Sequence, residues 1–564
     1  MADTAWLTPA TDTPPGIAAD AVPGVGPGAA ASAARPAPAQ RPPARRIGYA
    51  GTTWGFLAAA AGCLLAADIG VTALHPGAEL LRLLGGVLHP DLVAVGWASV
   101  VLTVAFAVLG VSAGAAAGFV LSFGFARSRA IRAGCAAVRS VHELFWALLF
   151  MQVAGPSATT GLFAIAIPYA GIFAKVFSEM IEEADLQAEQ VLPSGTGALS
   201  RFAYARLPDL AAPMGNYLLY RLECGMRSTL VLGFVGLPTM GFELEGYFRQ
   251  GRYAQAAAFV AVFYLLIATR RLWARPATLP FLLAGSAVAL VLLTHPVSGD
   301  GIWSALGRFL GHDIVPRPLR PSGAGGAGTG WDGMGAWLWP ILRDQVAPGA
   351  VNTLIVSQLA LAGSAVLALA LFPLTCRSFT GRLGRPLGRA LLVVIRSTPE
   401  YMVAYVLLQV MGPSMLPAVV ALALHNGGII GYLMGRHADT LSYRPDAPRR
   451  ADLYFWETLP RLYGQFLAYA LYRWEIIVRE SAIFGILGVR TLGFHVDAAI
   501  SELRLDVAVV LIVATGLLSM GIDALSRGLR RRLRLDSLGV RAASAPAAPA
   551  VLPPALAAGC PVPQ

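Results

Sequence analysis

Long runs of apolar residues recur along the chain, and short segments rich in arginine separate them. A helix needs roughly 20 apolar residues to cross about 30 Å of hydrocarbon. Twelve segments approach this length, so the pattern predicts an all-α integral membrane protein with about 12 transmembrane helices. The expected spans are residues 49–70, 97–124, 135–155, 158–180, 211–235, 255–270, 278–295, 350–375, 390–411, 415–435, 463–488 and 506–526.

The arginines orient these spans, because short basic loops stay in the cytosol. Basic clusters precede the first span and follow the second, fourth, sixth, eighth, tenth and last spans. We therefore expect both termini to be cytosolic. Residues 1–46 and 536–564 are rich in alanine and proline and lack a long apolar run, which predicts disordered cytosolic tails. The glycine-rich stretch 322–335 reads as a loop.

The chain contains an internal repeat. Residues 207–242 align with 459–494 at a constant offset of 252, with 14 of 36 positions identical, and residues 139–157 align with 396–414 at an offset of 257, with 9 of 19 identical. Each copy holds an even number of spans, so the copies cross the membrane in the same direction. Parallel repeats of this kind favour a central pathway between them.

Composition agrees with a membrane protein and excludes several activities. Only 13% of residues are charged, against about 25% in soluble domains, and the mean hydropathy is +0.61. Lys175 is the single lysine and lacks the flanking residues of a P-loop, so the chain cannot hydrolyse ATP by that motif. The scattered cysteines and histidines form no metal-ligand motif. We expect no catalytic residues, metal or cofactor, and no nucleic-acid partner; the expected surroundings are a lipid bilayer.

Charged residues inside the predicted spans repeat between the copies, and such residues are functional candidates because they are costly in a bilayer. Each copy places glutamate and arginine four residues apart, which allows pairing on one helix face. Arginine suits oxyanions through its planar fork of donors. Two interpretations stay open: an anion pathway, or buried pairs that only fix helix packing. The candidate residues are Arg139, Glu143, Arg221, Glu223 and Arg227, with Arg396, Glu400, Arg473, Glu475 and Arg479.

The loop between the fourth and fifth spans contains Glu189-Gln190-Val191, then Gly195, and then Leu207-Pro208. Its spacing resembles the EAA loop of ABC importer permeases, in which a glutamate, a glycine and Leu-Pro stand at these intervals. Residues 196–206 are expected to form a short helix available for docking. The runs 218–236, 139–143 and 421–425 resemble the phosphonate branch of that family, with two permease units fused in one chain.

This resemblance implies two tandem six-helix type I permease units, residues 47–275 and 276–535, in a bacterial inner membrane. It also implies cytosolic ATPase subunits, two in number, and an extracytoplasmic solute-binding protein. The second loop departs from the pattern, since it lacks five residues, and residues 449–458 are the expected substitute there. The implied docking residues are Glu189, Gly195, Arg201, Leu207 and Pro208, with Leu459 and Pro460.

The resemblance implies import of a phosphonate or related oxyanion. Two rival functions remain at this stage: import of an unrelated small solute, and secondary transport driven by an ion gradient without an ATPase. A membrane scaffold is less compatible with the paired intramembrane charges.

Overall fold

The computed structural model describes residues 48–184, 188, 191–193, 195–294, 299–320 and 330–535. Within these residues all regular elements are helices and none is a strand. The expected tails, most of the glycine-rich loop and Glu189 lie outside the described residues.

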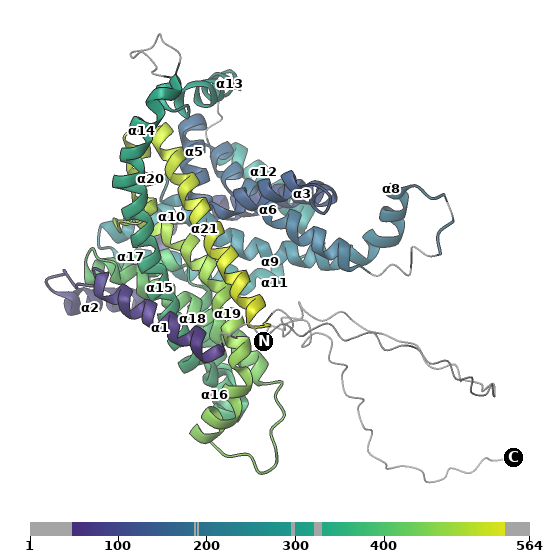
Figure 1. Ribbon diagram of the computed structural model, residues 1–564, viewed down its shortest axis with the longest axis vertical. Helices are drawn as coiled ribbons and strands as arrows, with labels where there is room; N and C mark the ends of the chain where they lie inside the picture. Colours follow the sequence, from purple (N-terminus) through teal and green to yellow (C-terminus); the bar gives the residue numbers. More distant parts are fainter. Residues whose placement is uncertain are drawn as a thin grey trace, which may run out of the picture.

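The first half of the chain forms a series of long helices joined by short connections (Figure 1). α8 continues through a π-helical turn, η2 (Phe202–Arg206), into α9. The helices are α1 (Tyr49–Ala66), α2 (Pro76–Leu88), α3 (Trp97–Phe125), α4 (Arg129–Ser140), α5 (Glu143–Ala154), α6 (Ala158–Glu183), α8 (Ala198–Arg201), α9 (Leu207–Gly233), α10 (Met240–Arg249) and α11 (Tyr253–Trp273).

The second half repeats the order of α3 to α11. A π-helical turn, η8 (Leu453–Thr458), again leads into the helix that begins with Leu-Pro. The helices are α12 (Leu279–Leu293), α13 (Gly299–Arg308), α14 (Met334–Ile341), α15 (Ala347–Leu371), α16 (Arg377–Ser397), α17 (Glu400–Met411), α18 (Leu416–Ala438), α19 (Leu459–Ser481), α20 (Leu492–Ser501) and α21 (Leu505–Arg532), with the short turns η7 (Phe372–Thr375) and η9 (Ala482–Gly485).

Equivalent side chains make the same contacts in both halves. Thr103 of α3 accepts a hydrogen bond from the Met240 amide at 2.9 Å, and Thr353 of α15 accepts one from the Leu492 amide at 3.1 Å. Each threonine thus satisfies a donor at the start of a following short helix, a group that the helix itself leaves unpaired. The repeat in the sequence is therefore also a repeat in packing.

Seven stretches of the described chain are long and apolar enough to cross a membrane, or up to nine if each of two bent helix pairs counts as one span. The seven include α14 and α15, which form one continuous stretch from Gly330 to Thr375, although the sequence pattern predicted a span only from residue 350. An all-helical, multi-span membrane protein is confirmed. All twelve predicted segments overlap helices. α12 is apolar but too short to count among the seven stretches, and α9 and α19 are not among them either.

The predicted spans 135–155 and 390–411 are not straight helices. α4 and α5 meet at 90°, and α16 and α17 meet at 86°. In the first half, Nδ1 of His142 accepts from the Leu144 amide at 3.2 Å and so caps a new helix. In the second half, Pro399 has no amide hydrogen with which to continue α16. Hydropathy detects the apolar content of these segments but not the capping side chains that divide them.

Small residues let the central helices approach closely. Gly110, Gly114 and Gly118 of α3 lie one turn apart against α6, where an added Cβ would come within 2.5–2.9 Å of Ile165, Tyr169 or Phe173. This is the small-residue packing typical of membrane helices. In the second half the equivalent contact between α15 and α18 uses Gly427 and Gly431 of α18 together with Gly363 of α15, whose added Cβ would lie 2.8 Å from that of Ala423.

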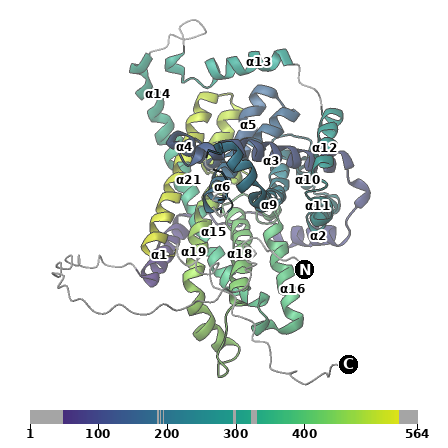
Figure 2. The ribbon, with the colours of Figure 1, turned by 90° about the vertical axis from the view of Figure 1, so that its right-hand side faces the viewer.

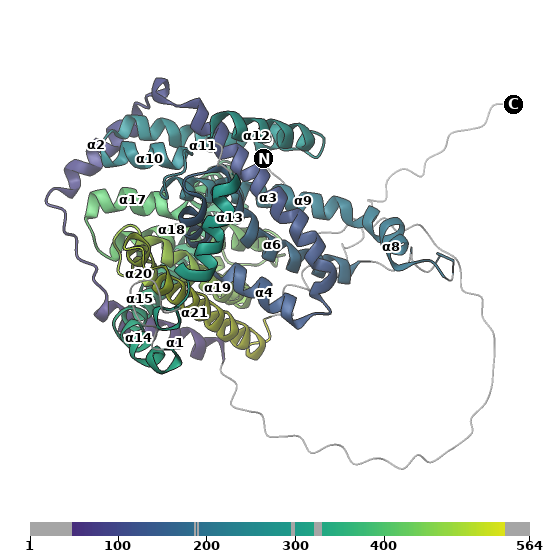
Figure 3. The same cartoon turned by 90° about the horizontal axis from the view of Figure 1, so that it is seen from above.

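The helix that precedes each repeat packs against the opposite half. α1 lies along α15, and the side-chain amide of Gln358 donates to the Phe56 carbonyl at 3.1 Å. α12 in turn lies along α3. α3, α6 and α9 cross the direction of α15, α19 and α21 (Figure 1), and the views from the side and from above show the same interleaving (Figures 2 and 3). The halves are therefore separate in sequence but entwined in space.

Candidate functional site

α9 and α19 carry the central charged residues predicted from the sequence. Each begins at a Leu-Pro pair, and proline is favourable there because its nitrogen needs no hydrogen-bond partner in the first helical turn. The two helices then run through the middle of the molecule. They present Arg221, Glu223 and Arg227 from α9, and Arg473, Glu475 and Arg479 from α19.

Arg227 reaches from the first half to the second. Its Nη1 lies 3.2 Å from Nε2 of His425 in α18. Nδ1 of His425 lies 3.0 Å from the carbonyl oxygen of Thr398, which can only accept, so Nδ1 holds the proton and Nε2 of the neutral ring accepts from Arg227. A hydrogen-bonded chain therefore runs from α9 across the interface to the bend between α16 and α17.

Arg479 makes the reciprocal crossing. Its Nη1 donates to the carbonyl oxygen of Arg139 at 2.8 Å, at the last turn of α4. Both arginines therefore end at the bend of a helix pair in the opposite half. The crossing contacts tie the position of each bend to that of the other half.

A carboxylate stands at the start of the second helix of each bent pair. Glu143 begins α5 and accepts a hydrogen bond of 2.6 Å from Ser228 Oγ of α9. Glu400 begins α17, and its Oε2 lies 3.8 Å from Nε2 of His425. Negative charge is favourable at a helix N-terminus, where unpaired amide groups point outward. The bends thus direct two carboxylates toward the arginines at the interface.

Arg221 and Arg473 occupy equivalent positions but have different partners. The Arg221 guanidinium carbon lies 5.1 Å from the ring centre of Tyr169 and 5.8 Å from that of Tyr217. Nε of Arg473 donates to Asn426 Oδ1 at 2.6 Å, and its Nη2 lies 3.7 Å from Glu480 Oε1. One half therefore surrounds its arginine with aromatic faces, and the other neutralises it with a carboxylate.

The pairs predicted from four-residue spacing do not form within 4.0 Å in the described structure. Glu223 instead lies 3.5 Å from Arg270 of α11, because Arg227 turns away toward His425. The other three predicted pairs also do not form within 4.0 Å in the described structure. Glu475 faces Asp523 of α21, and Arg396 stacks over the ring of Tyr432 at 4.4 Å. Glu223, Glu475 and Arg396 therefore have their partners on other helices.

Glu400, His425 and Glu480 form a group with the spacing of a metal site, since one ligand atom from each lies within 4.8 Å of the others. Their chemistry does not fit a cation. Nε2 of His425 already accepts from Arg227, and Arg473 lies beside Glu480. Two guanidinium groups already balance the charge of the two carboxylates, so the group has no net negative charge to hold a further cation.

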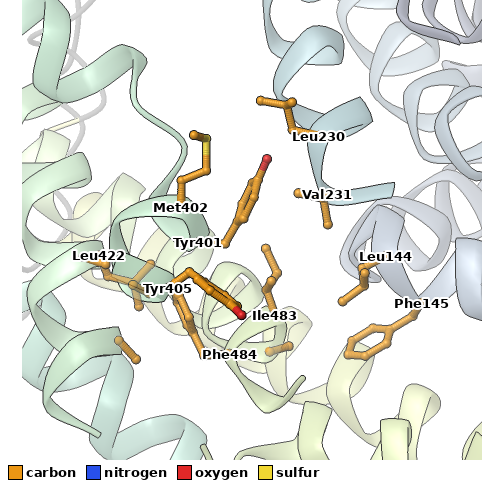
Figure 4. Close-up of a cluster of buried hydrophobic side chains, with 14 of the residues drawn as sticks. Leu144, Phe145, Leu230, Val231, Tyr401, Met402, Tyr405, Leu422, Ile483 and Phe484 are labelled. Carbon is orange, nitrogen blue, oxygen red and sulfur yellow. The ribbon is translucent and has the colours of Figure 1, made fainter. Parts of the chain in front are cut away.

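An apolar layer adjoins the charged residues along the same elements (Figure 4). Leu144 follows Glu143, Tyr401 follows Glu400, and Ile483 lies three positions after Glu480. Tyr401 is buried, and its ring lies 5.2 Å from that of Phe234 in an edge-to-face contact. The labelled members of the layer are Leu144, Phe145, Leu230, Val231, Tyr401, Met402, Tyr405, Leu422, Ile483 and Phe484.

The predicted docking segments project from the helical body (Figure 1). Gly195 has φ of +109°, which glycine tolerates readily, and α8 with η2 forms the expected short helix over residues 198–206. Arg201 lies in α8 and donates to the Thr196 carbonyl. Tyr204 is 81% exposed there. In the second half, residues 451–458 are helical as predicted, and Trp456 of η8 is 77% exposed.

Several central residues were absent from the predicted site. Tyr169, Asn426 and Glu480 contact the arginines but have no repeated counterpart of the same type, so the search for identities passed over them. Ser228 and His425 stood inside the matched runs, next to Arg227 and in 421–425. A search for charged or polar residues that differ between equivalent positions would have found Glu480 opposite Ser228.

Several apolar helices long enough to cross a membrane, with partly buried arginines and carboxylates between the two halves, are typical of a membrane permease. The chain resembles permease subunits of the phosphonate transport family. It is 27% identical to the "Phosphate-import permease protein PhnE" of Mycolicibacterium smegmatis over 507 residues, covering 83% of this chain and 92% of that protein.

A second relative matches a shorter region. The "Phosphite transport system permease protein PtxC" of Stutzerimonas stutzeri is 31% identical over 132 residues, which cover 23% of this chain and 48% of that protein. No family model matches the chain, and no solved structure matches it.

Proposed function

We propose that the chain is the permease of an ATP-driven ABC importer that carries a phosphonate or a related phosphorus oxyanion. Its relatives are named for import of phosphate and transport of phosphite. The observation that carries the proposal is the reciprocal crossing of Arg227 and Arg479 at the interface between the halves. Guanidinium groups held there can contact an oxyanion that passes between the two repeats.

The proposed pathway uses the ten charged residues predicted from the sequence, together with His425 and Glu480. Arg227 and Arg479 stand at its centre, and the apolar layer closes one end. A layer of packed apolar side chains blocks ions and water until the helices that carry it separate. Movement of the bent pairs α4/α5 and α16/α17 opens the layer, since both crossing arginines end at these bends.

We further propose that the full membrane domain holds twelve spans in two tandem type I units, residues 47–275 and 276–535. The bent pairs, α9, α12 and α19 complete this number together with the seven long apolar stretches. α9 and α19 remain in the bilayer despite their charges because those charges face other helices. The chain lies in a bacterial inner membrane with both termini in the cytosol, as the distribution of arginine predicts.

Two cytosolic ATPase subunits are the proposed source of energy, and the chain itself hydrolyses no ATP. One subunit docks on the EAA-type loop, which includes Glu189, Gly195, Arg201 and Leu207-Pro208. The other docks on η8 and Leu459-Pro460. Exposed aromatic side chains support both sites, since Tyr204 and Trp456 project from equivalent π-helical turns. A binding protein delivers the anion at the opposite face.

The proposal is tested by uptake into proteoliposomes that contain the chain with its ATPase and binding protein. We expect ATP-dependent uptake of phosphate, phosphite or an alkylphosphonate. Arg227→Gln removes the crossing guanidinium, and we expect at least about a tenfold fall in the uptake rate, equal to roughly 1.4 kcal/mol in the barrier. Arg343→Gln is the matched control, since Arg343 is exposed and its ion pair is with the exposed Asp344.

Three outcomes contradict the proposal in different ways. Uptake by the chain alone, driven by an ion gradient, would establish a secondary transporter. Transport of an unrelated solute with all three phosphorus anions rejected would remove the substrate class. Unchanged uptake and selectivity in a variant that combines Arg227→Gln with Arg479→Gln would assign these arginines to helix packing alone.

A further inference from the structure

The second half contains a short insertion that the first half lacks. Thr103 corresponds to Thr353, 250 positions later, and Arg139 corresponds to Arg396, 257 positions later. Seven additional residues therefore lie between these points in the second half. They fall at the start of α16, which is 21 residues long where α4 has 12.

This insertion builds a pocket of arginines. The chain kinks at Gly381, where φ is +69°, a conformation that glycine adopts without strain. The kink brings Arg377 of the preceding turn beside Arg382 and Arg385 of the following helix. The three side chains line a cavity of about 340 Å³.

The pocket has an excess of positive charge. Arg385 and Arg389 each donate to Oδ2 of Asp439 at 2.7 Å, so one carboxylate is shared between two guanidinium groups. Nε of Arg385 is buried without a hydrogen-bond partner. Arg377 and Arg382 face open space in the same cavity. Such a cluster attracts an anion with several acceptor oxygens.

An apolar stripe continues from the pocket along α16. Leu383, Leu387, Leu391 and Val394 repeat at helical spacing, and Leu383 and Leu387 are 84% and 73% exposed. A row of exposed leucines is unfavourable in water but stable against acyl chains. Arginines at one end and leucines along the helix match the two parts of a phospholipid.

We propose that the arginine pocket of α16 binds the phosphate of an anionic phospholipid, with the acyl chains along the leucine stripe. A free phosphate anion shares the headgroup chemistry but leaves the stripe uncovered. Basic pockets beside membrane helices are known to hold anionic headgroups. The bound lipid would stabilise the kinked start of α16. The other end of α16 is the bend at Thr398, which hydrogen-bonds to His425 and through it to Arg227.

The test compares lipid retention by purified full-length chains in detergent, measured by native mass spectrometry. The probes are phosphatidylglycerol, phosphatidylcholine and inorganic phosphate. We expect the unmodified chain to retain phosphatidylglycerol in preference to phosphatidylcholine. Arg377→Gln with Arg382→Gln should weaken this retention roughly 30-fold, given the usual contribution of each arginine near a lipid surface.

The matched control is Arg127→Gln with Arg129→Gln, which removes the same charge from exposed positions at the equivalent connection of the first half. We expect it to retain the lipid within a few-fold of the unmodified chain. A second readout is thermal unfolding, in which phosphatidylglycerol should raise the Tm of the unmodified chain and of the control but not of the pocket variant.

Four results would overturn the proposal. Equal loss of lipid in both double variants would indicate a general basic surface. Stabilisation by inorganic phosphate alone, abolished in the pocket variant, would assign the pocket to a free anion. Unchanged retention in the pocket variant would place the lipid elsewhere. If the pocket variant keeps the lipid but no longer co-purifies with the ATPase subunit, the pocket is a protein-docking surface.

Discussion

Two positions beside the central arginines hold different residues in the two halves. Ser228 of α9 corresponds to Glu480 of α19, and Tyr169 of α6 corresponds to Asn426 of α18. Glu480 and Asn426 neutralise and orient Arg473. The guanidinium group of Arg221 lies over the rings of Tyr169 and Tyr217, which are weaker partners than a carboxylate. In the proposed pathway, Arg221 is therefore the arginine whose protein partners compete less with an anion.

Exchange of these residues tests the difference directly. Ser228→Glu places a second carboxylate beside Glu143, which now accepts from Ser228 at 2.6 Å. We expect a loss of about 1–3 kcal/mol in the free energy of unfolding, because like charges meet in a buried site. Adding Tyr169→Asn supplies at position 169 the amide that Asn426 provides in the second half, where it orients Arg473. The double variant should therefore lose less than the sum of the two single variants, by at least about 0.5 kcal/mol.

The measurement is a double-mutant cycle by thermal unfolding in one detergent. Ser228→Gln controls for side-chain size without the added charge, and it should show no such coupling with Tyr169→Asn. Strict additivity of Ser228→Glu and Tyr169→Asn would show that the two positions do not share Arg221.

Ten charged residues of the candidate site were predicted from the sequence, but Glu480 and the partners of the arginines were not. Repetition of Arg227 and Arg479 at one offset was enough to select them. Spacing along one helix then predicted pairing with Glu223 and Glu475, yet Arg227 bonds His425 across the interface. Helical spacing fixes the positions of Cβ atoms, whereas the end of an arginine side chain extends to whichever neighbouring helix offers an acceptor.

At the scale of helices, both halves pack two helices closely, but the glycines that permit this contact stand at different positions. In the first half three glycines of α3 and Gly161 of α6 stand at the contact, and in the second half Gly363 of α15 joins Gly427 and Gly431 of α18. Either arrangement lets two backbones approach, because only one helix of a pair needs small residues at the contact. The helix axes can therefore keep one geometry even though the sequences of α3 and α15 diverge.

A single methyl group tests this contact. An added Cβ at Gly118 would lie 2.5 Å from the Cβ of Phe173 and 2.8 Å from the carbonyl oxygen of Ala170. Since backbone atoms cannot move aside cheaply, we expect Gly118→Ala to cost about 1–3 kcal/mol in the free energy of unfolding. Gly134→Ala in α4 is the control, because nothing lies within 4 Å of its added Cβ. It should be neutral or slightly stabilising. Equal stability of the two variants would mean that α3 and α6 separate easily.

The hydrophobic pattern was sufficient to find the helices but not their bends. The segments 135–155 and 390–411 are apolar enough for spans, and their bends depend on His142 and Pro399. A proline after a long apolar run is a readable signal for a break. The cap by His142 is harder to predict, since histidine is not a preferred cap and its ring acts here through one nitrogen.

At the scale of the molecule, the two halves exchange their first helices. Thr53 of α1 lies 2.6 Å from the hydroxyl of Tyr463 in α19, and Phe56 contacts the ring of Trp474 at 5.0 Å. The following connection also binds the second half, since the Thr72 amide donates to the Met411 carbonyl at 2.8 Å. No repeat search predicts this exchange, because α1 and α12 lie outside the aligned segments and their partners depend on how the halves meet.

The exchange predicts that the covalent link between the halves is not required for their association. A chain divided after Pro276, in the connection between α11 and α12, keeps α1 against α15 and α12 against α3. We expect the two co-expressed pieces to purify together in mild detergent, held by these helices and by Arg227 and Arg479. The same division without residues 1–75 removes the contacts of α1 and of the connection that follows it, and its pieces should separate at a lower detergent concentration. If the complete pieces elute apart, the exchanged helices contribute little, and the link itself keeps the halves together.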